Sequence, residues 1–190
     1  FYTSGGRNTT FTNCKVEETK WAGFGILYGS SYAFINCTAV NIQSYGFYIS
    51  CRGNQLNSCS AINCLDSGFV IGGGSNLLYS CTAQGNQRQG FYIKSSSNQL
   101  ILCRALDNRE HGFYIYRRCT SNLFKNCTAE HNGEDGFRVS ASTSTGNTFE
   151  DCLSKENTGY GYRDYAHPNN TYTNCIADHN GRGNGVPDHL

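Results

Sequence analysis

The sequence predicts an all-β fold, a single parallel β-helix (a solenoid) of about eight coils, each 22 to 25 residues long. Three observations predict it: a cysteine with that period, a glycine–aromatic pair nine residues after each of the first seven cysteines, and two recurring asparagines. Such a period is typical of a solenoid, in which each repeat buries its apolar face against its neighbours. The cysteines of the series are Cys14, Cys37, Cys59, Cys81, Cys103, Cys127, Cys152 and Cys175.

Short strands are predicted on both sides of the cysteine. One apolar column lies three residues before it and consists of Phe11, Phe34, Leu56, Leu78, Leu100, Phe124, Phe149 and Tyr172. A second column follows the glycine and consists of Ile26, Ile49, Ile71, Ile93, Ile115 and Val139. The residues between these positions are mostly polar, and this alternation with period two is typical of strands rather than helices. We therefore expect two or three short strands per coil, each paired in parallel with its equivalent in the next coil.

Asparagine recurs at two further positions in the repeat. The column five residues before the cysteine consists of Asn54, Asn76, Asn98, Asn122, Asn147 and Asn170, and the column five residues after it of Asn86, Asn108, Asn132, Asn157 and Asn180. Both columns are predicted to lie at corners, where asparagine tolerates the left-handed conformation and bonds its own backbone. Stacked coil upon coil, the side-chain amides are expected to bond along the axis as ladders.

The eight periodic cysteines are expected to form an inward ladder of small apolar side chains, most of them free thiols. Adjacent members are predicted to lie near the distance of a disulfide, but their parallel side-chain directions disfavour a bridge. The other three cysteines, Cys51, Cys64 and Cys119, lie at different offsets and have no obvious mutual partner.

Composition excludes several classes of function. The formal net charge is +1, only 15% of the residues are charged, and no basic run is present, so no nucleic-acid partner is expected. No apolar stretch approaches the length of a membrane span. The residues also indicate no cofactor.

The repeated pattern Asn-x-Phe/Leu-x-x-Cys-x-Ala, followed by Asn and by Gly-Phe-x-Ile, resembles the right-handed parallel β-helix repeats of the pectin-lyase-like superfamily. Within that superfamily it is most similar to the carbohydrate-binding and sugar-hydrolase group, whose members include mannuronan epimerases. The resemblance covers nearly the whole chain and implies a right-handed helix, as does the general rule for parallel crossovers. Because the matching residues are scaffold residues, the resemblance concerns the fold and leaves the chemistry open.

The two ends of the chain suggest a structural function. We expect one domain, residues 1–190, with no obvious cap at either end. Phe1 and Tyr2 enter in the phase of the aromatic column, and Gly185-Val186 nearly matches that phase, although Pro187 removes a donor from the last strand. Open ends of this kind predict either a piece of a longer β-helix or copies that stack head to tail into a fibre. The first hypothesis is therefore an extracellular structural subunit whose partner is another copy or the rest of a longer β-helix.

The second hypothesis is a carbohydrate-active module that binds or modifies an acidic polysaccharide; as an enzyme it would be a lyase, an epimerase or a glycoside hydrolase. The candidate saccharide-binding residues are Tyr92, Tyr114, Arg138, Arg163, Glu110 and Glu134. Aromatic faces stack on sugar rings, and arginine binds carboxylates through two hydrogen bonds. An ordinary exposed sheet face would also favour tyrosine and arginine, so both explanations stay open.

Proton transfer, if the module is an enzyme, has four candidate residues: His111, Asp135, Asp164 and His167. His111 and Asp135 are predicted to be vertical neighbours in adjacent coils, and such a pair is suited to moving protons. The segment from Tyr160 to Pro168 is similar to the Tyr-Gly-Phe-Asp-Pro-His-Asp/Glu motif of mannuronan epimerases, but its acid is displaced and Asp-Pro-His is absent. Asp164 replaces isoleucine in an inward column, so its carboxylate must either find a partner such as Arg163 or His167 or shift its ionisation.

Two further sets of residues carry weaker signals. His131, Glu156 and His179 share one outward column, and imidazole with carboxylate suits zinc; however, unlike neighbours are also what a stable sheet face needs, so we expect no metal. Four asparagines stand in glycosylation acceptor sequences: Asn8, Asn36, Asn126 and Asn169. These acceptors favour an extracellular or cell-surface location.

Overall fold

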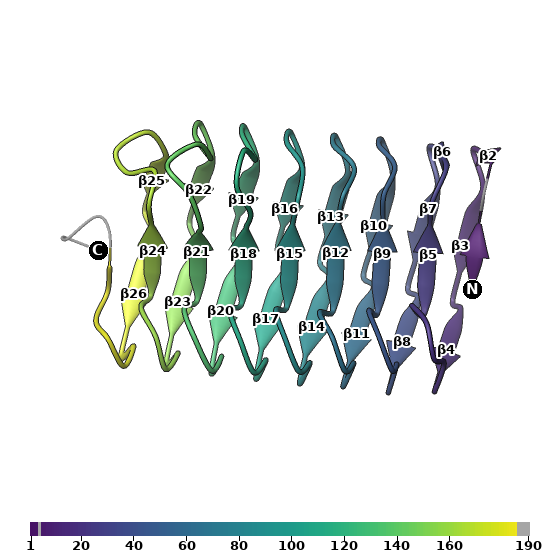
Figure 1. Ribbon diagram of the computed structural model, residues 1–190, viewed down its shortest axis with the longest axis horizontal. Coiled ribbons are helices and arrows are strands. Elements are labelled where there is room, and N and C mark those ends of the chain that lie inside the picture. The colour runs from purple at the N-terminus through teal and green to yellow at the C-terminus, as the bar shows by residue number, and fades with distance from the viewer. Residues whose placement is uncertain (4, 186–190) are drawn as a thin grey trace.

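The chain is a parallel β-helix, as predicted. The computed structural model describes residues 1–3 and 5–185, and these residues form short strands joined by turns, with no helix among them. Figure 1 shows the strands of successive coils lying side by side along a rod, with β3 and β25 near its opposite ends. Each coil contributes one strand to each of three eight-stranded parallel sheets, so the prediction of two or three strands per coil is confirmed.

The first sheet follows the glycine of each repeat. Its strands are β1 (Tyr2–Thr3), β5 (Phe24–Ile26), β9 (Phe47–Ile49), β12 (Phe69–Ile71), β15 (Phe91–Ile93), β18 (Phe113–Ile115), β21 (Phe137–Val139) and β24 (Tyr162–Asp164). Equivalent residues of neighbouring repeats pair with one another, for example Phe91 with Phe113. The side chain between the two inward residues of each strand therefore points outward, in one column along the rod.

The second sheet lies before the cysteine and the third lies after it. The second contains β3 (Thr10–Thr12), β7 (Ala33–Ile35), β10 (Gln55–Asn57), β13 (Leu77–Tyr79), β16 (Gln99–Ile101), β19 (Leu123–Lys125), β22 (Thr148–Glu150) and β25 (Thr171–Thr173). The third contains β4 (Lys15–Glu17), β8 (Thr38–Val40), β11 (Ser60–Ile62), β14 (Thr82–Gln84), β17 (Arg104–Leu106), β20 (Thr128–Glu130), β23 (Leu153–Lys155) and β26 (Ile176–Asp178). A small extra sheet pairs β2 (Gly6–Arg7) with β6 (Gly29–Ser30).

Stacked aromatic rings fill the core beside the first sheet. The ring centroids of Phe91 and Phe113 lie 4.8 Å apart with an interplanar angle of 4°, and the stack continues from Phe24 to Tyr162. A ring pair of this kind stabilises a protein by about 0.5–1.5 kcal/mol beyond the burial of its surface. Because parallel pairing places identical side chains one strand spacing apart, the register of the coils determines these stacks.

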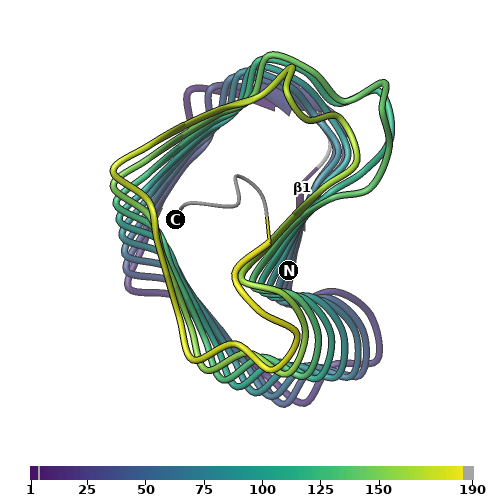
Figure 2. The same cartoon turned by 90° about the vertical axis from the view of Figure 1, so that its left-hand side faces the viewer.

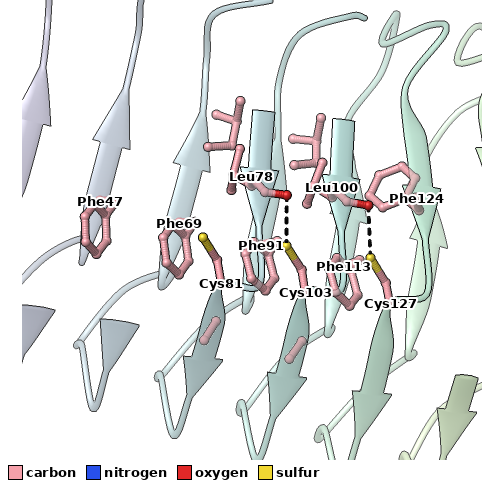
Figure 3. Close-up of a cluster of buried hydrophobic side chains, with 14 of the residues drawn as sticks. Phe47, Phe69, Leu78, Cys81, Phe91, Leu100, Cys103, Phe113, Phe124 and Cys127 are labelled. Carbon is pink, nitrogen blue, oxygen red and sulfur yellow. Dashed lines mark hydrogen bonds between the residues drawn. The ribbon is translucent and has the colours of Figure 1, made fainter. Parts of the chain in front are cut away.

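The cysteine column points inward, and all eleven cysteines of the chain are free thiols. Figure 3 shows the sulfur of Cys103 beside the carbonyl oxygen of Leu78, 3.5 Å away, and the sulfur of Cys127 beside that of Leu100, 3.2 Å away. Each thiol thus donates to the coil before it. The predicted ladder of unpaired cysteines is confirmed. Cys64 lies outside it, at the corner five residues after Cys59, where later coils have the asparagines of the second ladder.

Both predicted asparagine ladders are present. In the second ladder the side-chain Nδ2 of Asn108 donates to Oδ1 of Asn132 at 3.0 Å and to the carbonyl oxygen of Ala83 at 3.1 Å. The backbone N–H of Asn108 donates to the same Oδ1 of Asn132. The first ladder runs in the same way from Asn54 to Asn170. Side chains therefore satisfy backbone groups at corners where no strand partner exists.

The prediction that the ladder asparagines adopt the left-handed conformation is wrong. Positive φ occurs instead at the residue just before each of them except Asn170: φ is 54° at Asp107, before Asn108, and 55° at His131, before Asn132. The left-handed residue turns the chain, and the next residue can then point its side chain into the coil. The residue before each periodic cysteine also has positive φ, so each middle coil has three such corners.

We expect Asn108→Ala to lower the free energy of unfolding by about 2–4 kcal/mol, because it removes two donated and two accepted hydrogen bonds inside the coil. Asn57 is exposed on β10, and Asn57→Ala is the matched control, with an expected change below about 0.5 kcal/mol. Denaturant unfolding followed by circular dichroism measures both. Equal effects of the two substitutions would contradict the ladder.

We expect rapid labelling of no more than two of the eleven thiols in the folded protein, Cys14 and Cys51, because the other nine are buried. Burial also raises the pKa of Cys64 and of Cys119 to about 11, which leaves little reactive thiolate at neutral pH. Mass spectrometry after brief alkylation, with and without denaturant, measures this. Native labelling of Cys103 at the rate of Cys14 would be the contrary result.

Candidate functional site

Three adjoining pockets form one groove along the first sheet, from β15 to β24, and the last of them also reaches the inward-facing residues Tyr162 and Asp164. The tyrosine pocket, about 250 Å³, is lined by Arg88, Gln89, Tyr92, Glu110, His111, Tyr114, Glu134 and Arg138. The central pocket, about 270 Å³, is lined by Gly133, Glu134, Asp135, Arg138, Thr158, Gly159, Arg163 and Arg182. The terminal pocket, about 430 Å³, is lined by Tyr160, Tyr162, Arg163, Asp164, Tyr165, Arg182 and Gly185.

Neighbouring pockets share side chains, which makes the groove continuous along the axis. Glu134 and Arg138 line both the tyrosine and the central pocket, and Arg163 and Arg182 line both the central and the terminal pocket. Seen end on, the coil outline is indented on the side where β1 lies (Figure 2). The turns before the first sheet bulge outward there, and residues of two of these turns, Glu134 and Gly159 among them, line the central pocket.

His111 is buried in the turn between β17 and β18 and is held at both ring nitrogens. Its Nδ1 accepts the backbone N–H of Asp135 at 3.1 Å, so its proton lies on Nε2, which donates to Glu134 at 2.9 Å. The ring also stacks on Tyr114, with centroids 5.1 Å apart. Burial lowers the pKa of His111 to about 4; Asp135 opposes this shift, and the guanidiniums of Arg138 and Arg163 add to it. His111 is therefore neutral at pH 7.

Asp135 is buried below the central pocket, and both of its carboxylate oxygens have partners. Oδ1 accepts the backbone N–H of Tyr160 at 2.8 Å, and Oδ2 accepts from Nη1 of Arg138 at 3.0 Å. This pair holds Arg138 in the groove floor. The buried Nε of Arg138 has no hydrogen-bond partner among the described residues.

Arg163 and Arg182 bring positive charge to the far end of the groove. The guanidinium of Arg163 lies over the rings of Tyr160 and Tyr165, 5.5 and 5.1 Å from their centroids. Within residues 1–3 and 5–185, neither Arg163 nor Arg182 forms an ion pair with a carboxylate. Two guanidiniums are thus available to an anion between the central and the terminal pocket.

The opposite end of the groove is aromatic. Tyr92 and Tyr114 lie on adjacent strands with ring centroids 5.3 Å apart. The pKa of Tyr92 is raised to about 12, mainly by burial and to a smaller extent by the neighbouring Tyr114. Glu110 beside them accepts from Nε of Arg88 at 3.3 Å and from the amide of Gln89. The structure therefore places all six sequence-predicted saccharide-binding residues along one groove.

Asp164 and His167 do not join the His111–Asp135 pair. Asp164 pairs in register with Val139, faces inward, and accepts from Asn170 and from the hydroxyl of Tyr172, both at 2.9 Å. The expectation of a partner in Arg163 or His167 is wrong, because the inward direction of the carboxylate turns it toward the corner asparagine. His167 is exposed on the turn after β24.

The candidate metal column is only partly assembled. His131 and Glu156 form an ion pair, and with Glu130 they offer ligand atoms within 4.8 Å of one another. The ammonium group of Lys155 lies 3.1 Å from Glu156, where it competes with a cation. His179, the third candidate ligand, pairs with Asp178 instead.

The remaining sequence candidates lie on the surface or at the ends. The four glycosylation candidates, Asn8, Asn36, Asn126 and Asn169, are all exposed. Of the predicted assembly residues, Phe1 and Tyr2 are 47% and 50% exposed, at the β1 end of the rod. Val186 and Pro187 lie outside the described residues.

Sequence reasoning missed Arg182, Tyr160 and Tyr165 as groove residues. Arg182 had a readable signal, because it stands seven residues after its cysteine, in the same column as Arg88, Glu110 and Glu134. Tyr160 had a signal of the same kind, because it stands eight residues after its cysteine, in the same column as His111 and Asp135. Tyr165 follows β24 directly and reaches the groove from the turn there.

Comparisons with known proteins agree with the fold. A family described as a right-handed β-helix region matches residues 1–144 and 119–187. The A-module of the Azotobacter vinelandii mannuronan C-5 epimerase AlgE4 is similar in structure, with a TM-score of 0.81 and 14% identity over 94% of this chain and 55% of that one. The catalytic domain of a GH87 α-1,3-glucanase in complex with nigerose has a TM-score of 0.50 and 14% identity over 96% of this chain and 47% of that one.

The chain spans about half the length of these solved structures. No curated protein sequence matches the chain. Within the described part of the chain, no helix has the length and apolar character needed to cross a membrane.

We expect the His111 ring to titrate near pH 4 in the folded protein, because burial disfavours its charged form. The unfolded chain, with a value of about 6.5, binds this proton first, so the free energy of unfolding falls as the pH drops from about 6.5 to 4, by at most about 3 kcal/mol. NMR of the histidine rings measures the titration, and the same measurement on the unfolded protein is the reference. Titration of His111 near 6.5 would contradict the buried neutral ring.

Proposed function

The chain belongs to the family of right-handed β-helix regions, and we propose that its groove on the first sheet binds an acidic polysaccharide. The observation that carries this proposal is the pair of guanidiniums, Arg163 and Arg182, that lack carboxylate partners within the described residues and line the same two pockets. Guanidinium groups bind carboxylates and sulfates through paired, charge-assisted hydrogen bonds. An unpaired arginine pair in a groove therefore favours an anionic ligand.

Shape and aromatic content support a polysaccharide rather than a small anion. Three connected pockets extend over four neighbouring strands, which are three spacings of about 4.8 Å apart in total. Tyr92 and Tyr114 offer ring faces and hydroxyls, which suit the apolar and polar sides of a sugar. The same fold occurs in a mannuronan C-5 epimerase and in an α-1,3-glucanase, so this scaffold is known to serve carbohydrate chemistry.

Binding is better supported than catalysis. A general acid or base must reach the reacting proton of the substrate. Both ring nitrogens of His111 and both carboxylate oxygens of Asp135 are already occupied by protein partners, and both residues are buried. We accordingly propose a binding role for these two residues, in which they hold Arg138 and Tyr114 in place.

We also propose that the protein acts outside the cell or at its surface. The exposed acceptor asparagines and a polysaccharide ligand support that location. Stacking of copies into a fibre, or continuation into a longer β-helix, stays a prediction. Its support is that β3 and β4 at one end of the described rod, and β25 and β26 at the other, each have a neighbouring strand on one side only among the described residues.

We expect Arg163→Ala to weaken binding of acidic oligosaccharides at least about tenfold, because it removes a charge-assisted contact. Arg104 is exposed on β17, outside the groove, and Arg104→Ala is the charge-matched control, with an expected change below about twofold. A glycan array followed by calorimetry measures both. Absence of any acidic glycan among the ligands, or equal losses in the two variants, would refute the proposal.

A further inference from the structure

The groove changes the sign of its charge along the helix axis, and the geometry points to a ligand with the matching pattern. Resting on the proposed function, we propose that the groove selects a heteropolysaccharide: an acidic sugar between Arg163 and Arg182, and a sugar without negative charge in the tyrosine pocket. A homopolymer in which every unit is a uronate does not fit this pattern. The inference depends on which charges in the groove are already neutralised.

Most charges of the tyrosine pocket cancel within the protein. Arg88 pairs with Glu110 at 3.3 Å. Arg138 pairs with the buried Asp135 at 3.0 Å. Neither pair leaves a net charge for a ligand in this pocket.

Glu134 is the exception in the tyrosine pocket. Its side chain is 51% exposed, and its one ion-pair contact among the described residues is with Nε2 of His111. The tautomer of His111 makes that contact a neutral hydrogen bond, since Nδ1 accepts from the backbone of Asp135. No cation is therefore paired with the Glu134 carboxylate, which lies at the boundary of the tyrosine and central pockets.

A carboxylate on a sugar in the tyrosine pocket would be repelled by Glu134. Two like charges a few ångströms apart at a protein surface disfavour binding by roughly tenfold or more. An uncharged sugar meets no such cost, because its hydroxyls can donate to the oxygens of Glu134 and Glu110. Its apolar side can lie against Tyr92 and Tyr114, which line the same pocket.

The end of the groove at Arg163 and Arg182 favours a sugar with a negative charge. Arg163 and Arg182 have no carboxylate partner in the described chain. Asp164, next to Arg163 in sequence, is engaged inside the coil by Asn170 and Tyr172, and Asp178, near Arg182, pairs with His179. The distance from β15 to β24 is about 14 Å, three strand spacings, so one short oligosaccharide can contact both ends. The two ends thus impose different charges on different units of the same ligand.

The test compares two oligosaccharides of equal length by calorimetry: one that alternates glucuronate with N-acetylglucosamine, and an oligogalacturonate with a carboxylate on every unit. We expect the wild-type protein to bind the alternating oligosaccharide at least about tenfold more tightly. Glu134→Gln should strengthen oligogalacturonate binding about tenfold and reduce the preference to about twofold or less. Glu17→Gln is the matched control, because the Glu17 side chain is 52% exposed on β4, away from the groove.

The outcomes separate this inference from the proposed function. Equal or tighter binding of oligogalacturonate by the wild-type protein, lost in Arg163→Ala, would overturn the heteropolysaccharide and leave the acidic groove standing. An unchanged preference in Glu134→Gln would overturn the role of Glu134 in the same way. Binding of neither oligosaccharide, with a folded protein by circular dichroism, would overturn both proposals.

Discussion

The structure depends on hydrogen bonds that run along the axis at the corners of each coil. Strands satisfy their own backbone groups by parallel pairing, but a corner has no ladder partner and would otherwise bury free N–H groups. Here the backbone N–H of one corner asparagine donates to the side-chain oxygen of the next, as from Asn76 to Asn98 at 2.9 Å. This contact lets the chain turn at two of the three corners of each coil and still keep one register along the described rod.

Because the register is fixed, residues at the same position of successive repeats form one continuous strip on the surface of the rod. Side chains at the same place in successive repeats stand about one strand spacing apart, so a change of residue type along a column becomes a change of chemistry along the rod. The outward column of the first sheet passes from Tyr92 and Tyr114 to Arg138 and Arg163. The groove therefore has an aromatic end and a cationic end without any departure from the repeat.

The sequence alone predicted the features that recur in every repeat. It did not predict features that depend on the local backbone of a single turn. The cysteine column, the ladders and the strand register follow from periodicity, and so does the placement of His111 above Asp135. The left-handed residue is displaced by one position because backbone direction at a corner cannot be read from side-chain type. The partners of Asp164 and the contribution of Tyr165 depend on the local course of the turn after β24.

Amide hydrogen exchange, resolved to single residues, tests the central claim most directly. The account predicts that the backbone N–H groups of Asn76, Asn98, Asn108 and Asn132 exchange as slowly as those in the middle of the strands, although they lie at corners. Exchange of these four amides at the rate of exposed turn residues would show that the corners are open and that the register is held by the strands alone.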